Sequence, residues 1–119
     1  MLKIKFKSPL PIKIDLSSVF TDIGEASTAL TDAIFLVKDP NDRNNNIINK
    51  TLIGSDIVQS GDSIDVQIDP IADFDTGKLE EGKRYKFFCG IKTTNLNVVY
   101  LPINTNDNVI QIERNGINV

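Results

Sequence analysis

Apolar and polar residues alternate along most of this chain, and this period of two constrains the fold more than any other feature. Leu2, Ile4 and Phe6 are separated by single lysines, and residues 63–69 alternate just as regularly. Successive side chains of a β-strand point to opposite faces, so this pattern predicts strands with one buried face. Ile and Val supply 25 of the 119 residues and Ala only four, a bias that favours sheets over helices.

Short segments of this kind, separated by turn residues, recur about every ten residues. We expect strands at residues 2–7, 10–16, 33–38, 47–53, 56–59, 63–69, 83–93, 98–103 and 109–113. Residues 33–38 are apolar on both faces, which predicts a central strand. Seven to nine short strands with such turns predict an all-β fold, an immunoglobulin-like antiparallel β-sandwich.

The chain length predicts one sandwich domain, residues 1–119. Residues 1–16 form its basic N-terminal strands, and residues 17–32, which lack alternation, form a long connection with one helical turn. Turn-forming residues at 39–46 predict a hairpin tip. In the connector 71–81, Thr76 or Asp75 is placed to cap a second helical turn.

The residue types that enzymes use most are missing. The chain has no histidine, the commonest general base and zinc ligand. Its one cysteine, Cys89, alternates in register with Tyr85, Phe87 and Ile91, which predicts a core position rather than a nucleophile. The composition therefore indicates a binding or structural protein, not an enzyme, and we expect no cofactor.

An aspartate-rich stretch has one feature of a calcium site. Residues 73–77 begin like an EF-hand loop, but Gly77 stands where an oxygen ligand belongs and no Glu closes the loop. A site assembled from several loops remains an alternative to ordinary turn and cap chemistry. Its candidate ligands are Asp56, Asp62, Asp65, Asp69, Asp73 and Asp75.

Charge is segregated along the chain. The net charge of −3 and the pI near 4.8 argue against nucleic-acid binding. Residues 1–14 carry four lysines and no acid, residues 54–81 carry eight acids and one lysine, and residues 82–119 are basic again. This pattern suits head-to-tail packing of copies or docking onto an oppositely charged neighbour, with an ordinary solvated surface as the alternative.

No segment is long and apolar enough to cross a membrane, and charges stand where a signal peptide needs an apolar stretch. We therefore expect no membrane partner, and we expect the chain to stay where it is made until it is assembled.

Three quarters of the chain resembles a known family. Residues 31–38 (TDAIFLVK), the turn 60–62, the segment 68–75 and residues 79–87 (LEEGKRYKF) are similar to the N-terminal domain of phage baseplate upper proteins. That family has an Ile-Phe-x-Val-Lys strand, an Asp-rich connector and a strand that begins Leu-x-x-Gly-x-Tyr. The opening residues 6–9 replace its Arg-Gly-Asp turn, and the connection 17–32 is longer.

The resemblance implies a non-enzymatic virion structural protein of a tailed phage, a tail or baseplate adaptor that binds other virion proteins in multiple copies. Such a protein is made in the host cytoplasm and ends in the virion. With the chain ending at Val119, we expect the family's docking role and not its fibre-holding role. The charge pattern and a possible sheet edge at a proline give the interface candidates Lys3, Lys5, Lys7, Asp62, Asp65, Asp73, Asp75 and Pro102.

Two other functions remain open. One is a capsid-decorating or head-fibre protein of the same fold. The other is a carbohydrate-binding or adhesion module, because β-sandwiches host many of these. A small enzyme is the least supported alternative.

Overall fold

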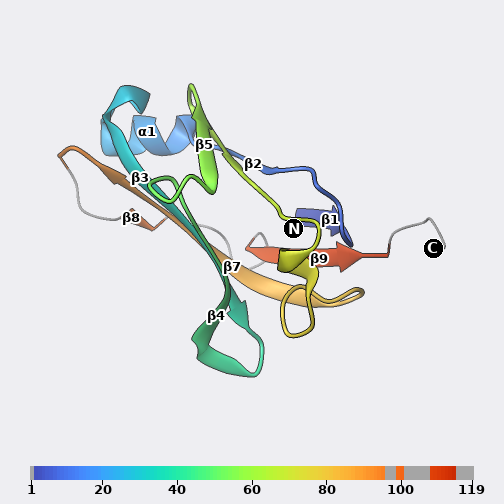
Figure 1. Cartoon of the computed structure of the whole chain (residues 1–119). Helices are drawn as coiled ribbons and strands as arrows, with labels where there is room; N and C mark the ends of the chain where they lie inside the picture. The colour runs from blue at the N-terminus through green and yellow to red at the C-terminus, as the bar shows by residue number, and fades with distance from the viewer. Residues whose placement is uncertain (1, 96–98, 101–107, 115–119) are drawn as a thin grey trace.

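The computed structural model describes residues 2–95, 99–100 and 108–114, and their strands form two sheets (Figure 1). The larger sheet has the order β1-β9-β7-β3-β4, with β8 also paired to β7, and the smaller has the order β2-β6-β5. The strands of the larger sheet are β1 (Leu2–Lys5), β3 (Leu30–Asp39), β4 (Asp42–Thr51), β7 (Arg84–Thr93), β8 (Val99–Tyr100) and β9 (Val109–Glu113). Those of the smaller sheet are β2 (Ile12–Asp15), β5 (Ile57–Ser60) and β6 (Ser63–Val66). The prediction of an all-β, sandwich-like fold is confirmed.

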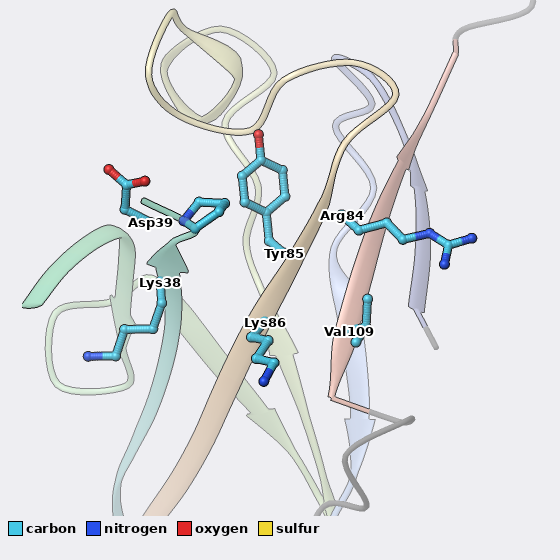
Figure 2. A pocket seen from close by; sticks show the side chains of 7 residues that line it. Lys38, Asp39, Arg84, Tyr85, Lys86 and Val109 are labelled. Atoms are coloured by element: carbon cyan, nitrogen blue, oxygen red, sulfur yellow. The ribbon is translucent and has the colours of Figure 1, made fainter. Parts of the chain in front are cut away.

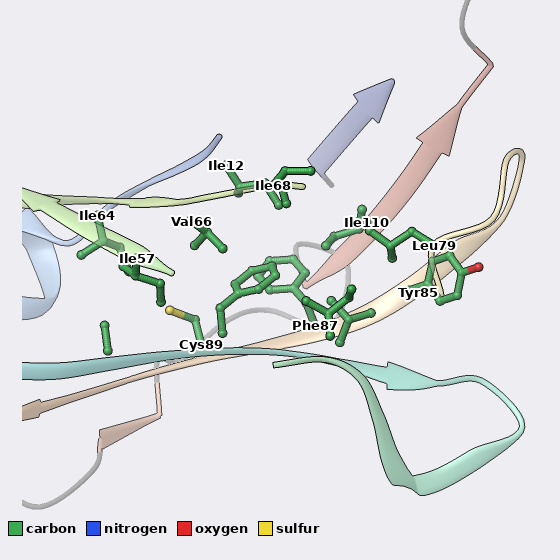
Figure 3. Packing of buried hydrophobic residues seen from close by; sticks show 14 of the residues in the cluster. Ile12, Ile57, Ile64, Val66, Ile68, Leu79, Tyr85, Phe87, Cys89 and Ile110 are labelled. Carbon is green, nitrogen blue, oxygen red and sulfur yellow. The ribbon is translucent and has the colours of Figure 1, made fainter. Parts of the chain in front are cut away.

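Side chains from both sheets form one hydrophobic cluster (Figure 3). Ile12, Ile64 and Val66 of the smaller sheet are buried, as are Phe87 and Cys89 of the larger. The Phe87 ring stacks on that of Phe35 in β3, with centroids 5.3 Å apart. The alternating pattern thus places its apolar residues between the sheets, and β7 buries the side predicted for it.

The strand β3 is central, as predicted, because it pairs with both β4 and β7. The pairing of β1 with β9 is parallel, so the prediction of a wholly antiparallel sandwich is wrong at this edge. The reason lies in the segment after β1. Pro9 and Pro11 lack the N–H groups that a strand needs for pairing, so the chain crosses to the other sheet instead of folding back on β1.

Several strands and helical turns begin or end at other residues than the sequence predicts. The strand β4 begins at Asp42, so the hairpin tip is shorter than residues 39–46, and register shifts on either side of Lys38 accommodate the extra pairing. The connection 17–32 holds more than one helical turn, because it contains both α1 (Ser17–Ile23) and η1 (Ser27–Ala29).

The helical turn in the connector 71–81 comes earlier in the chain than predicted. This turn is η2 (Ala72–Phe74), which precedes Thr76, and neither Thr76 nor Asp75 caps its start; Asp75 instead follows its last residue and donates its backbone N–H to the carbonyl of Ala72. At the start of η2, the carboxylate of Asp69 accepts the N–H groups of Ile71 and Ala72, at 2.8 and 3.0 Å. These bonds lower the pKa of Asp69, because they favour its charged form.

A tyrosine at the start of β7 holds the end of this connector in place. The Tyr85 hydroxyl accepts the N–H of Glu80 at 2.8 Å and donates to the carbonyl of Lys78 at 3.1 Å. Since Tyr85 is buried, these bonds satisfy a hydroxyl that would otherwise be unpaired in the core.

Candidate functional site

The outer side of the larger sheet carries a group of cations contributed by three strands. Residues of β1, β3 and β7 that alternate with the buried ones point away from the core. The register aligns Lys3 with Gln111 and Gln111 with Arg84, so two segments far apart in the sequence meet on one face. We call this surface the basic face, and its cations are Lys3, Lys5, Lys38, Arg84, Lys86 and Lys92.

Acids on the same side neutralise only part of this charge. The Glu113 carboxylate lies 4.0 Å from the Lys5 ammonium, and both are partly exposed. Asp32 accepts the backbone N–H groups of Ala33 and Ile53, at 2.8 and 3.2 Å. These bonds leave its negative charge in place, so Glu113 and Asp32 together offset two of the six positive charges. The basic face therefore keeps a positive excess.

An apolar strip lies among these cations. Phe88 of β7 is 38% exposed, and Leu36 lies directly opposite it on β3. The Lys38 ammonium lies 6.0 Å from the centre of the Phe88 ring, within the range of a cation–π contact. Aromatic side chains are enriched at protein interfaces, so the exposed Phe88 makes this strip a candidate contact area.

The basic face is hollowed at one end. A cavity of about 480 Å³ opens between the ends of β3, β7 and β9, and Figure 2 shows the three cations of its lining, whose charged ends point in different directions. Its lining residues are Lys38, Asp39, Pro40, Arg84, Tyr85, Lys86 and Val109. This cavity can receive a carboxylate side chain, since it holds three cations and one acid.

A second cavity, of about 370 Å³, adjoins the first and shares four of its lining residues. Here the Lys83 ammonium donates to Glu80 at 2.8 Å, and this bond raises the pKa of Lys83. Lys83 is thus paired within the chain, and the cations open to a partner are those of the first cavity.

The outer side of the smaller sheet has the opposite charge. Lys13, Asp65 and Val58 stand in one row across its three strands, and Val58 is 50% exposed. Asp15 and Asp62 lie beside this row, because the N–H of Leu16, the residue after Asp15, donates to the Asp62 carbonyl at 2.8 Å. We call this surface the acidic face, and its charged residues are Lys13, Asp15, Asp62 and Asp65.

The structure divides the N-terminal lysines. Lys3 and Lys5 join the basic face, whereas Lys13 lies on the acidic face. Lys7 belongs to neither strand: it has a φ of 62° in the turn after β1, and its ammonium lies 5.5 Å from the centre of the Phe6 ring.

The acidic candidates are divided too. Asp62 and Asp65 lie on the acidic face, but Asp73 and Asp75 belong to the connector around η2. Asp73 is only 7% exposed and is paired inside the fold, whereas Asp75 is exposed. Pro102 lies outside the described residues.

Sequence reasoning missed Lys38 and Phe88 as members of the site. The signal was present in β7, where Arg84, Lys86 and Phe88 alternate with the buried Tyr85 and Phe87. Sequence reasoning assigned a role only to the buried residues of this strand and none to the exposed residues between them.

No group of three or more acidic, cysteine or histidine side chains in the described part of the chain is arranged to hold a metal ion. Within the same residues, no helix has the length and apolar character needed to span a membrane. No protein-family model, curated protein or solved structure matches this chain.

Proposed function

We propose that this chain is a non-enzymatic structural subunit of a tailed-phage virion, a tail or baseplate adaptor that docks onto other virion subunits through its basic face. One observation carries the docking surface: cations from β1, β3 and β7 lie on the same outer face of the larger sheet as the exposed Phe88. Complementary charge steers association and fixes orientation, while a central apolar residue supplies contact area. The assignment to a virion rests on the family resemblance.

The strand order supports an immunoglobulin-like fold. In such domains, strands B, E and D lie in one sheet and strands C, F and G in the other. The smaller sheet here, β2-β6-β5, matches B-E-D, and β3, β7 and β9 match C, F and G, with β4 as an added strand beside C.

Two local features agree with this assignment. Tyr85 bonds back to the preceding connector from the start of β7, as the tyrosine corner does at the start of strand F. Phe35 on β3 lies opposite Cys89 on β7, the two strands that carry the core tryptophan and one disulfide cysteine in antibody domains. Here a phenylalanine and a free thiol fill these places.

Gold labelling of purified particles with an antibody to this chain tests the virion assignment. The particles are those of the phage whose genome encodes the chain. We expect label on the tail or its tip, and label over the head would favour capsid decoration instead. Unlabelled particles, from cells that make the protein, would overturn the proposal, and a glycan array would then test the carbohydrate-binding alternative.

Charge reversal tests the docking surface. We expect purified wild-type protein to rebind particles that lack it, and to bind less as salt rises. The variant Arg84→Glu/Lys86→Glu should lose this rebinding. Lys7→Glu, a reversal at a residue that lies on neither face, is the control and should rebind normally. Equal rebinding by both variants would remove the basic face from the proposal.

A further inference from the structure

The two faces of the sandwich are complementary in both charge and apolar character. On the basic face, the exposed Phe88 lies among cations that include Lys38 and Lys86. On the acidic face, the exposed Val58 lies in the same row as Asp65. The faces belong to different sheets, so they look outward in opposite directions from the shared core (Figure 1).

We propose that the occupant of the basic face is the acidic face of a second copy of this chain. This inference rests on the proposed function, because it names the partner of the same surface. In the assembly, Phe88 of one copy packs near Val58 of the next, and the cations around the first cavity face the aspartates of that neighbour. The cavity between β3, β7 and β9 receives a carboxylate from the acidic face.

Such a contact joins two different surfaces, so a pair of copies retains one free acidic face and one free basic face. Interfaces of this kind extend into a ring where the rotation closes and into a stack where it does not. Two copies cannot satisfy both faces of both molecules by a single contact of this type. The assembly therefore grows with concentration rather than stopping at a dimer.

Sedimentation velocity of the full chain tests the proposal. We expect the average mass of the wild-type protein to rise above the 13.2 kDa of one chain between micromolar and millimolar concentration, and to fall back at high salt. Arg84→Glu/Lys86→Glu leaves one cation and three acids around the first cavity, so both contact surfaces of this variant are acidic. Asp62→Lys/Asp65→Lys leaves three cations and one acid on the acidic face, so both contact surfaces of that variant are basic. Each variant alone should remain monomeric.

Mixing the two variants supplies the decisive observation. Copies with two acidic faces and copies with two basic faces should alternate, so an equimolar mixture should recover the large species that each variant has lost. Asp75→Lys is the matched control: it changes the net charge in the same direction as Asp65→Lys but lies off both faces, and it should associate like the wild-type protein.

Three results would overturn the inference: a wild-type protein that stays monomeric at low salt, a variant that associates alone, or a mixture that does not recover. Circular dichroism and thermal unfolding of each variant show that it is folded before its mass is interpreted. These results are separate from the gold labelling. A monomeric chain that labels particles would overturn the inference and support the function, and a self-associating chain absent from particles would do the reverse.

Discussion

The ammonium of Lys50 lies 2.9 Å from the Oδ2 atom of Asp73, and both side chains are nearly buried. Lys50 belongs to β4 in the larger sheet, and Asp73 belongs to η2 in the connector before β7. The same Asp73 oxygen accepts the N–H of Asp69 at 2.7 Å. This ion pair therefore ties the connector to the larger sheet.

Replacing Asp73 by alanine should destabilise the protein. Removing one partner of a largely buried ion pair leaves the other charge without compensation, so we expect the free energy of unfolding to fall by about 3 kcal/mol. Denaturant titration measures this change. Asp75→Ala is the matched control, since Asp75 is exposed on the same connector, and its effect should lie within about 0.5 kcal/mol. Equal stability of the two variants would show that the pair contributes little.

The Tyr85 hydroxyl supplies a second test of this connector. Tyr85→Phe keeps the ring but leaves the N–H of Glu80 and the carbonyl of Lys78 without their partner. We expect the free energy of unfolding to fall by about 1 to 2 kcal/mol. Lys83→Ala, which removes only an exposed ion pair with Glu80, should change it far less. A Tyr85→Phe variant as stable as the wild type would contradict this account.

Burial of the only thiol makes stability depend on alkaline pH. Burial raises the pKa of Cys89 to about 12, whereas the free thiol titrates near 9.0. Because the folded pKa is the higher one, the thiol's contribution is complete below pH 9.0 and is lost as the pH rises toward 12. Between those pH values, the free energy of unfolding should fall faster with pH for the wild type than for Cys89→Ala, and the two slopes should differ by about 1 kcal/mol per pH unit.

Denaturant titrations of both proteins at several alkaline pH values measure this difference in slope. The cavity left by Cys89→Ala lowers stability equally at every pH, so it does not affect the comparison. Parallel slopes would contradict the prediction. The thiol should also react with a disulfide reagent slowly in the folded protein and quickly in denaturant, since only the thiolate is nucleophilic.

Local patterns predicted the core well because burial in a strand depends on the period of the sequence. The buried positions Tyr85, Phe87 and Cys89 follow from alternation alone. Pairing between distant strands does not, and the parallel contact of β1 with β9 depends on where the chain goes after Pro9. The same break explains why Lys3 and Lys13, near neighbours in the sequence, lie on opposite faces.

The candidate site was predicted only in part for a similar reason. Net charge along a segment shows which residues are charged, but it does not show which face of a sheet each one occupies. Asp73 looked like any other aspartate of an acidic stretch, because its partner Lys50 is distant in the sequence. Lys38 and Lys86 became neighbours only once β3 and β7 were paired.

Two glycines should resist substitution for different reasons. Gly61, in the turn between β5 and β6, has a φ of 59°, and a Cβ there would meet no atom within 4 Å. Gly61→Ala should therefore lower the free energy of unfolding by about 1 kcal/mol through its backbone alone. Gly54 lacks a positive φ, but a Cβ there would lie 2.6 Å from Oγ1 of Thr51.

The double-mutant cycle with Thr51→Ala separates these causes. Removing Oγ1 relieves the contact at residue 54, so Gly54→Ala should destabilise the Thr51→Ala protein less than it destabilises the wild type. Thr51→Ala by itself also removes the bond from the N–H of Gly54 to Oγ1, and the cycle subtracts this cost. The effect of Gly61→Ala should be the same in both backgrounds, because its origin is the left-handed backbone. Thermal unfolding of the three single and two double variants measures both couplings. Additive effects at Gly54 would show that the contact with Thr51 is not what excludes a side chain there.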